Sequence, residues 1–193
     1  MAEYLLARQR DGLPPDVGEV LIGRLSEDGL GLNWHITQVP PVVIVPAKMD
    51  GEAWGVHIHQ RAVTKIQEET ARWPRVETGG VLMGRLSEVC RTIHVVDVLD
   101  PPEDSTRSAS EFILGMTGLH QQMETYSDIV GWSLYCVGTW HSHLSSTGPS
   151  ATDRATAKAV SLARLTPSTF LIHTPNGFRA LLADAKEGRL GDD

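Results

Sequence analysis

Short runs in which apolar and polar residues alternate recur along the chain, and longer runs with helical spacing separate them. Period-two alternation and β-branched residues predict strands at 17–25, 30–37, 42–45, 56–59, 79–86, 91–99, 134–140, 170–173 and 178–182. Apolar residues at spacings of three and four predict helices over 61–72, 112–126 and 155–164. Strands interleaved with helices in this way are typical of an α/β protein.

Turn-forming residues divide the chain into an N-terminal part and a larger core. Ser26-Glu27-Asp28-Gly29 separates the first two predicted strands and contains the Asp-Gly pair that β-hairpins favour. Pro40-Pro41 then separates this hairpin from the strand at 42–45. We predict a β-rich N-terminal extension over 1–50, a core domain over 51–185 and a charged tail over 186–193.

Composition excludes several classes of protein. At 193 residues with 41% hydrophobic and 21% charged residues, the chain has the composition of a globular protein with a real core. A net charge of −7 argues against non-specific nucleic-acid binding, which requires clustered Lys and Arg. No segment has the features of a signal peptide or a membrane span, so we expect a cytoplasmic protein without a membrane partner. The isolated Cys90 and Cys136 agree with a reducing compartment, and the apolar strand around Cys136 lacks the polar partner of a nucleophilic cysteine.

The most informative stretch is Trp140-His141-Ser142-His143, which continues the predicted strand at 134–140. Because side chains on a strand repeat every two residues, His141 and His143 are expected to point to the same side. Asp153 lies ten residues beyond His143, close enough for the intervening loop to fold it back toward the imidazoles. Two imidazole nitrogens and one carboxylate form a three-ligand zinc set that leaves one tetrahedral position for water.

Each of these features also has an explanation without a metal. Paired histidines on a strand are often structural, and Ser150 with Asp153 before a helix is also an N-terminal capping signature. A second His-x-His run, His57-Ile58-His59, is interpreted as a strand that leads into a helix, because no Ser-x-x-Asp follows it. His120 is interpreted as structural, since it is isolated from any carboxylate motif.

Taken together, the motifs resemble the signature of the JAMM (MPN-plus, JAB-type) zinc metallopeptidases. The run 141–143 with Ser150 and Asp153 is similar to the downstream His-Ser/Thr-His and Ser-x-x-Asp elements of that family. Upstream, the run 77–84 (Glu-Thr-Gly-Gly-Val-Leu-Met-Gly) resembles its glutamate-bearing strand. Two departures are visible: Leu144 stands where the family usually has proline, and the spacer to the serine has six residues where seven are usual.

The resemblance implies a fold, a cofactor and a role for each residue. The fold would be a central mixed β-sheet flanked by helices, with the MPN/JAB and cytidine-deaminase-like architecture. One zinc ion would be held by His141, His143 and Asp153, and it would lower the pKa of a bound water toward ~7. Glu77 would act as general base and acid, and Ser150 would donate a hydrogen bond to the tetrahedral oxyanion.

The resemblance also implies a substrate class. Such enzymes cleave after the C-terminus of a ubiquitin-like or sulfur-carrier protein, either to process a precursor or to release it from an isopeptide conjugate. The compact chain looks like the prokaryotic branch, in which E1-like and E2-like enzymes accompany these proteases, sometimes in antiphage systems. The loop at 103–110 would lie over the active-site face.

Two other functions were weighed. A metal-free MPN-type scaffold would keep the fold and bind partners without catalysis, and the intact ligand set argues against it. A zinc deaminase of related topology would need a His-x-Glu and a Pro-Cys-x-x-Cys motif, and neither occurs in the chain.

Overall fold

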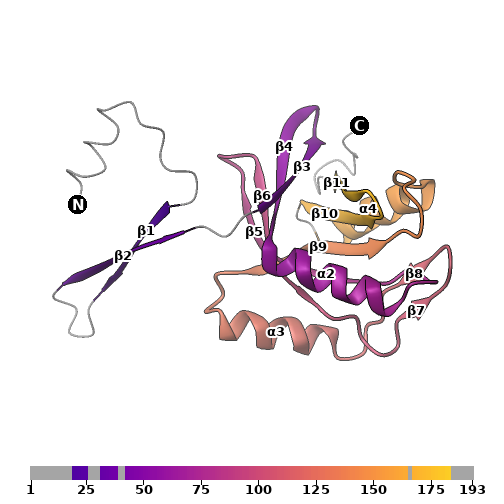
Figure 1. Ribbon diagram of the computed structural model, residues 1–193, viewed down its shortest axis with the longest axis horizontal. Helices are drawn as coiled ribbons and strands as arrows, with labels where there is room; N and C mark the ends of the chain where they lie inside the picture. The colour runs from indigo at the N-terminus through magenta and orange to yellow at the C-terminus, as the bar shows by residue number, and fades with distance from the viewer. Residues whose placement is uncertain (1–18, 26–30, 39–41, 165–166, 184–193) are drawn as a thin grey trace. The chain divides into compact units, whose positions relative to one another are not determined.

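The computed structural model describes residues 19–25, 31–38, 42–164 and 167–183. The chain divides into two compact units, Met1–Pro41 and Val42–Asp193. In the first unit, β1 (Glu19–Leu25) pairs with β2 (Leu32–Gln38) in an antiparallel hairpin, as the sequence predicts (Figure 1). The turn of this hairpin and the predicted tail at 186–193 lie outside the described residues.

The second unit is built on a seven-stranded sheet. In spatial order its strands are β11 (Gly177–Ala183), β10 (Ser168–Thr174), β9 (Tyr135–Ser142), β5 (Gly79–Ser87), β6 (Thr92–Leu99), β4 (Glu52–His59) and β3 (Val42–Met49). The pairs β9–β10 and β4–β6 are parallel and the other neighbours are antiparallel, which confirms the predicted mixed sheet. The sheet curls, so that its edge strands β3 and β11 contact each other.

Strand β3 differs from its prediction in length and in the unit to which it belongs. It continues through Pro46, and it pairs with β4 inside the second unit, although the sequence analysis placed 42–49 in the N-terminal extension. A proline is tolerated in β3 because this is an edge strand, where one row of N–H groups has no ladder partner. Asp50 and Gly51, both with positive φ, form the tight turn to β4.

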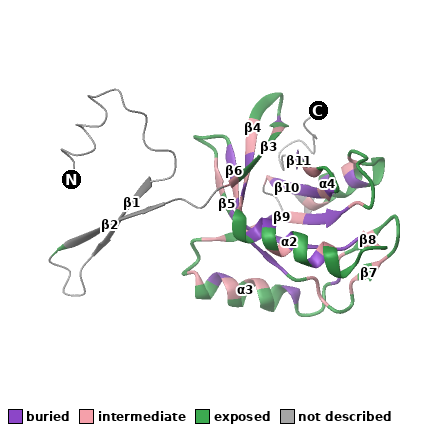
Figure 2. Cartoon of the chain, in the orientation of Figure 1, coloured by how far each residue is buried: buried purple, intermediate pink, exposed green. Residues whose placement is uncertain are grey.

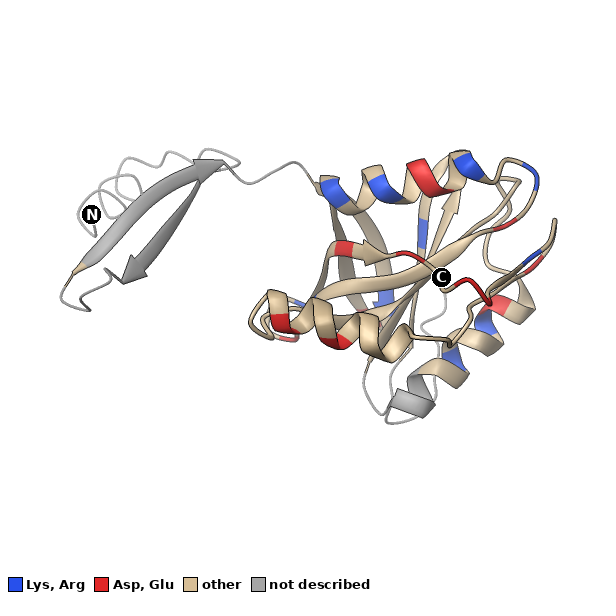
Figure 3. Cartoon of the chain, turned by 90° about the horizontal axis from the view of Figure 1, so that it is seen from below, with Lys and Arg blue, Asp and Glu red and all other residues tan. Residues whose placement is uncertain are grey.

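Three described helices cover the sheet: α2 (Gln60–Arg72), α3 (Leu119–Ile129) and α4 (Ala151–Arg164). Ala62, Val63 and Ile66 of α2 pack on one face, in a cluster that contains Leu82 and Leu171. The residues on either side of Leu82 and Leu171 in their strands face the opposite side of the sheet, where they pack against α3 and α4. The sheet therefore lies between α2 on one side and α3 and α4 on the other (Figure 3), and its strands contain most of the buried residues (Figure 2).

Helix α3 begins later than the sequence predicts. Phe112 lies in β8 (Phe112–Ile113), which pairs with β7 (Thr106–Arg107), and Met116 is exposed. The carboxylate of Asp104 accepts the backbone N–H groups of Met116 and Thr117, which holds the chain in a turn. Gly118 then has a φ of 71°, and the helix starts only after it.

Candidate metal centre

The two histidines lie at the end of β9, on the sheet face that also packs against α4. His141 is buried within the strand, and His143 follows directly after its last residue. Their ring centroids are 4.7 Å apart. The predicted alternation is confirmed, since both imidazoles point into the same volume.

Asp153 completes this pair from the first turn of α4. Its Oδ1 lies 3.3 Å from Nε2 of His141, and its Oδ2 lies 3.3 Å from Nε2 of His143. Ser150 N–H donates to Oδ2 at 2.7 Å, while Asp153 N–H donates to the Ser150 hydroxyl at 3.1 Å, which forms a reciprocal capping box. The capping and metal explanations are therefore compatible, because the same capping interaction fixes the carboxylate beside the imidazoles.

The electrostatic setting favours an ionised Asp153. Burial acts to raise its pKa, but the adjacent imidazole of His141 and hydrogen bonds from Ser150 outweigh burial and hold the pKa well below its usual range. A carboxylate that stays charged beside two imidazoles is a suitable ligand for a divalent cation.

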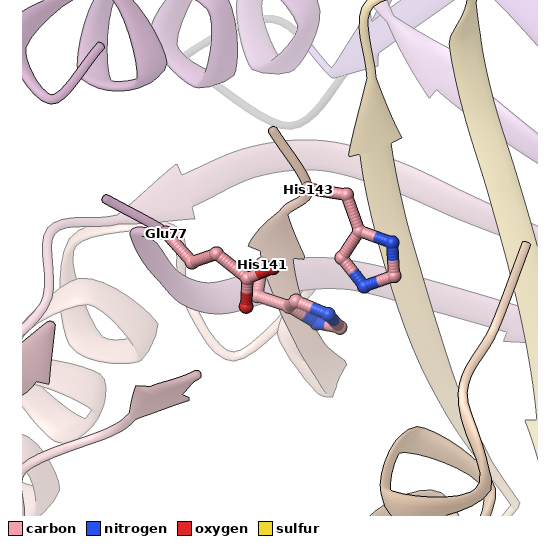
Figure 4. A group of neighbouring side chains, drawn as sticks. All are labelled: Glu77, His141 and His143. Carbon is pink, nitrogen blue, oxygen red and sulfur yellow. The ribbon is translucent and has the colours of Figure 1, made fainter. Parts of the chain in front are cut away.

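Glu77 joins the cluster from the segment that precedes β5. Its carboxylate and the imidazoles of His141 and His143 offer ligand atoms that all lie within 4.8 Å of one another. Figure 4 shows the side chain of Glu77, from one backbone segment, close to those of His141 and His143, which come from another. Burial raises the pKa of Glu77; Asp153 and Glu111 add to this rise, and His143 opposes it. Glu77 N–H donates to the carbonyl of Ser108 at 2.7 Å, so the loop predicted to lie over this face does lie beside the glutamate.

Two hydrogen bonds set the glutamate segment in register with the histidines. Ser142, between the two histidines, donates its N–H to the carbonyl of Thr78 at 2.7 Å. Thr78 N–H in turn donates to the Ser142 hydroxyl at 3.0 Å. Both residues are fully buried, so these bonds are shielded from water.

A network that the sequence analysis missed supports the same segment. The Thr78 hydroxyl donates to the buried carboxylate of Glu69 at 2.9 Å and accepts from Nε of Arg107 at 3.2 Å. Arg107 also lies 3.5 Å from Glu69 and stacks over Trp73. Helix α2, the start of β5 and the β7–β8 hairpin are thereby tied together next to Glu77. No local pattern indicates this network, because its members are far apart in the sequence.

Gly79 lets the hairpin approach the site. A Cβ at this position would overlap the backbone oxygen of Trp140 and the ring of Phe112. Only glycine permits this contact without a shift of β9 or of the hairpin.

The donor atoms fit a tetrahedral metal ion. Neither ring nitrogen of His141 has a hydrogen-bond partner among the described residues, although both are buried. Nε2 therefore approaches Asp153 without the alignment of a hydrogen bond, as expected for two ligands of one ion. Two ligand atoms at ~2.1 Å from a tetrahedral zinc lie about 3.4 Å apart, close to the 3.3 Å observed here. Nδ1 of His143 faces the carbonyl of Thr147 at 3.3 Å, which leaves its Nε2 for the metal.

The structure thus brings together all five residues predicted for the site: Glu77, His141, His143, Ser150 and Asp153. The loop with six spacer residues and an exposed Leu144 still places Asp153 against both imidazoles. Two other histidine groups lie elsewhere. His57 and His59 are on β4, which is separated from β9 by β5 and β6, and His120 is exposed on α3.

Comparison with known proteins shows the family to which the chain belongs. The profile of a family described as prokaryotic homologs of the JAB domain matches residues 59–183, a span that contains the whole metal centre. The chain belongs to this prokaryotic JAB family.

The chain is also similar to one curated protein and to one solved structure. A protein of Enterobacter hormaechei subsp. hoffmannii (strain UCI 50) named CD-NTase/cGAS isopeptidase is 30% identical over 98 residues, which are 49% of this chain. The chain spans about half (51%) of the length of that relative. A protein of Desulfitobacterium hafniense with a known solution structure aligns over 70% of this chain and 88% of its own, at 18% identity and a TM-score of 0.46. Within the described residues, no helix has the length and apolar character needed to cross a lipid bilayer.

Proposed function

We propose that the protein is a zinc-dependent isopeptidase that cleaves at the C-terminus of a ubiquitin-like protein. The observation that carries the proposal is the convergence of His141, His143 and Asp153 beside a buried glutamate. Family membership and the name of the Enterobacter relative support hydrolysis of an isopeptide bond.

The three ligands would hold one zinc ion and leave a position open. A zinc ion held here would act as a Lewis acid that polarises the scissile carbonyl and lowers the pKa of a bound water. His141 has no competing hydrogen bond among the described residues, and the capping box at Ser150 holds Asp153 in place. The ligand set is thus oriented before a metal binds.

Glu77 is placed to act as the general base and acid of the reaction. Its carboxylate lies next to the imidazoles, and its backbone is held by Ser108 and through Thr78. It would take a proton from the attacking water and return it to the nitrogen of the leaving amine. Glu111 also acts on Glu77 electrostatically, and its side chain is exposed.

Ser150 is placed to stabilise the oxyanion. Its hydroxyl accepts the N–H of Asp153 and also acts on the Asp153 carboxylate. During attack the hydroxyl proton would turn to the oxygen that becomes negative and donate a hydrogen bond to it.

The substrate would be a conjugate or precursor of a ubiquitin-like or sulfur-carrier protein in the bacterial cytoplasm. The relative's name points to CD-NTase-type proteins as carriers of the conjugate, and so to an antiphage pathway. E1-like and E2-like enzymes of that pathway would be its partners. Gene neighbours that encode such proteins would identify the ubiquitin-like protein for assays.

The test uses that ubiquitin-like protein with a fluorophore linked through an amide to its C-terminus. Glu77→Gln should lower turnover by ~100-fold or more, as loss of a general base does, while the zinc content is unchanged. The matched control Glu111→Gln should keep most of the activity. If Glu77→Gln turns over normally, the assignment of the base is wrong. If the zinc-loaded wild type cleaves neither this substrate nor an isopeptide conjugate, the chain acts as an MPN-type scaffold.

Ser150 requires a test that separates its two roles. Ser150→Ala should lower turnover by ~100-fold, and it should also lower helix stability by about 1 kcal/mol through the lost cap. Ser150→Thr keeps both the cap and the donor and should retain activity. Equal rates for the alanine variant and the wild type would remove Ser150 from the reaction.

A further inference from the structure

A second group of histidines lies on the sheet away from the candidate metal centre at His141, His143 and Asp153, which is called the JAB site below. His57 and His59 on β4 alternate with Val56 and Ile58, which are fully buried in the core under α2. Alternation therefore directs both imidazoles to the opposite face of the sheet. Both side chains are only partly buried there, so solvent reaches them.

The strand register adds a third imidazole that the sequence does not indicate. Strand β4 pairs in parallel with β6, and His57 lies directly beside His94. His94 alternates with the buried Ile93 and Val95, so it faces the same side as His57. The ring centroids of His57 and His94 are 5.3 Å apart, and those of His59 and His94 are 6.0 Å apart.

These separations are close to those of imidazoles that share a metal ion. Two rings bound to one tetrahedral zinc through bonds of ~2.1 Å have centroids about 5 Å apart. In the JAB site the corresponding distance is 4.7 Å. The nitrogens of the second group do not yet converge within 4.8 Å of one another as those of the JAB site do, so the rings would have to turn. Gly55 leaves open the space in which a Cβ would come within 3.1 Å of Nε2 of His57.

The chemical setting of the three rings suits metal binding. Their recorded side-chain contacts within the described chain are with one another, and no carboxylate pairs with them. Metal binding requires the neutral form of each imidazole. Arg85 lies opposite His94 on β5, and its side chain is exposed to solvent.

We propose that His57, His59 and His94 form a second metal site, for zinc or another borderline divalent cation. A His-x-His on one strand and a histidine on its neighbour supply three imidazoles from one face of a sheet, with the fourth position left to water. Three imidazoles are an established ligand set for zinc. The ion would link β4 to β6, and through His59 it would hold the start of α2.

The test counts bound zinc on the full chain by equilibrium dialysis and elemental analysis at neutral pH. Four proteins are compared: wild type, Asp153→Ala, His94→Asn and the control His120→Asn, whose histidine is exposed on α3. We expect two zinc ions per chain for the wild type and the control, and one for each of the other variants. Loss of a direct ligand should weaken the second site at least tenfold, since outer-shell substitutions already cost that much.

The outcomes separate this site from the proposed function. Unchanged zinc in His94→Asn overturns the second site, whatever happens in Asp153→Ala. Unchanged zinc in Asp153→Ala together with a loss in His94→Asn overturns the JAB centre and leaves the second site standing. If His94→Asn does not fold, the double variant His57→Gln/His59→Gln is measured instead, and the same loss of one zinc ion is required.

Discussion

Thr78 offers a sharp test of how the glutamate segment is held. Thr78→Val preserves the shape of the side chain and removes its hydroxyl, which donates to Glu69 at 2.9 Å and accepts from Arg107 at 3.2 Å. Thr78→Ser is the matched variant, because it keeps the hydroxyl and loses only a methyl group. Both substitutions are made at a fully buried position.

The expected magnitudes differ between the two variants. A hydrogen bond to a charged group contributes ~1.5–3 kcal/mol, and Glu69 retains its contacts with Arg72 and Arg107 at 3.2 and 3.5 Å. We therefore expect Thr78→Val to lower the free energy of unfolding by about 2–3 kcal/mol. Thr78→Ser should cost only ~0.8 kcal/mol for one buried carbon group.

Urea unfolding of the metal-free protein measures both values. With a slope of about 2 kcal/mol per molar urea, Thr78→Val should shift the midpoint by ~1 M. Its turnover should fall by about tenfold with zinc retained, because Glu77 is the preceding residue and misplacement of a catalytic group is costly. If the valine variant is as stable as the serine variant, the hydroxyl network does not support the site as described.

Three further substitutions test other parts of the account. Burial lowers the pKa of His173 in the folded protein. As the pH falls, this histidine is therefore protonated in the unfolded chain before it is protonated in the folded one. Its contribution to the free energy of unfolding is present above the ordinary pKa of 6.5 and is lost as the pH falls below that value. His173→Asn should therefore flatten the acid side of the stability profile measured by urea unfolding in chelator. Asp97→Asn should cost about 2 kcal/mol in thermal unfolding, because its buried carboxylate contacts Arg61 and Lys65 at 2.9 and 2.8 Å; full stability would contradict this. Gly79→Ala should weaken zinc binding at least ~10-fold by displacing β9, whereas Gly148→Ala, where an added Cβ meets nothing within 4 Å, should bind normally.

The sequence predicted the clustering of His141, His143 and Asp153 because the signals for it are local. His141 and His143 point to the same side because side chains on a strand repeat every two residues. The position of Asp153 follows from its role in capping the next helix. Glu77 depends on a distant segment, and only the family resemblance connected it to the histidines. The structure places it beside them through the pairing of Gly79 with His141 across β5 and β9.

Long-range pairings account for what the sequence analysis missed. His94 lies beside His57 only because β4 and β6 pair in parallel, and periodicity within a strand does not specify its neighbour. Arg107 reaches Glu69 from another part of the chain for the same reason. The start of α3 was misplaced because apolar spacing continued through residues that Asp104 holds in a turn.

The most direct measurement is anomalous diffraction at the zinc absorption edge from crystals of the zinc-loaded full chain. The account predicts a peak within ~2.0–2.2 Å of Nε2 of His141, Nε2 of His143 and a carboxylate oxygen of Asp153, with the Glu77 carboxylate facing the same volume. A second peak among His57, His59 and His94 is expected from the further inference. Crystals that contain zinc elsewhere in the molecule and show no peak between His141, His143 and Asp153 would contradict the central claim.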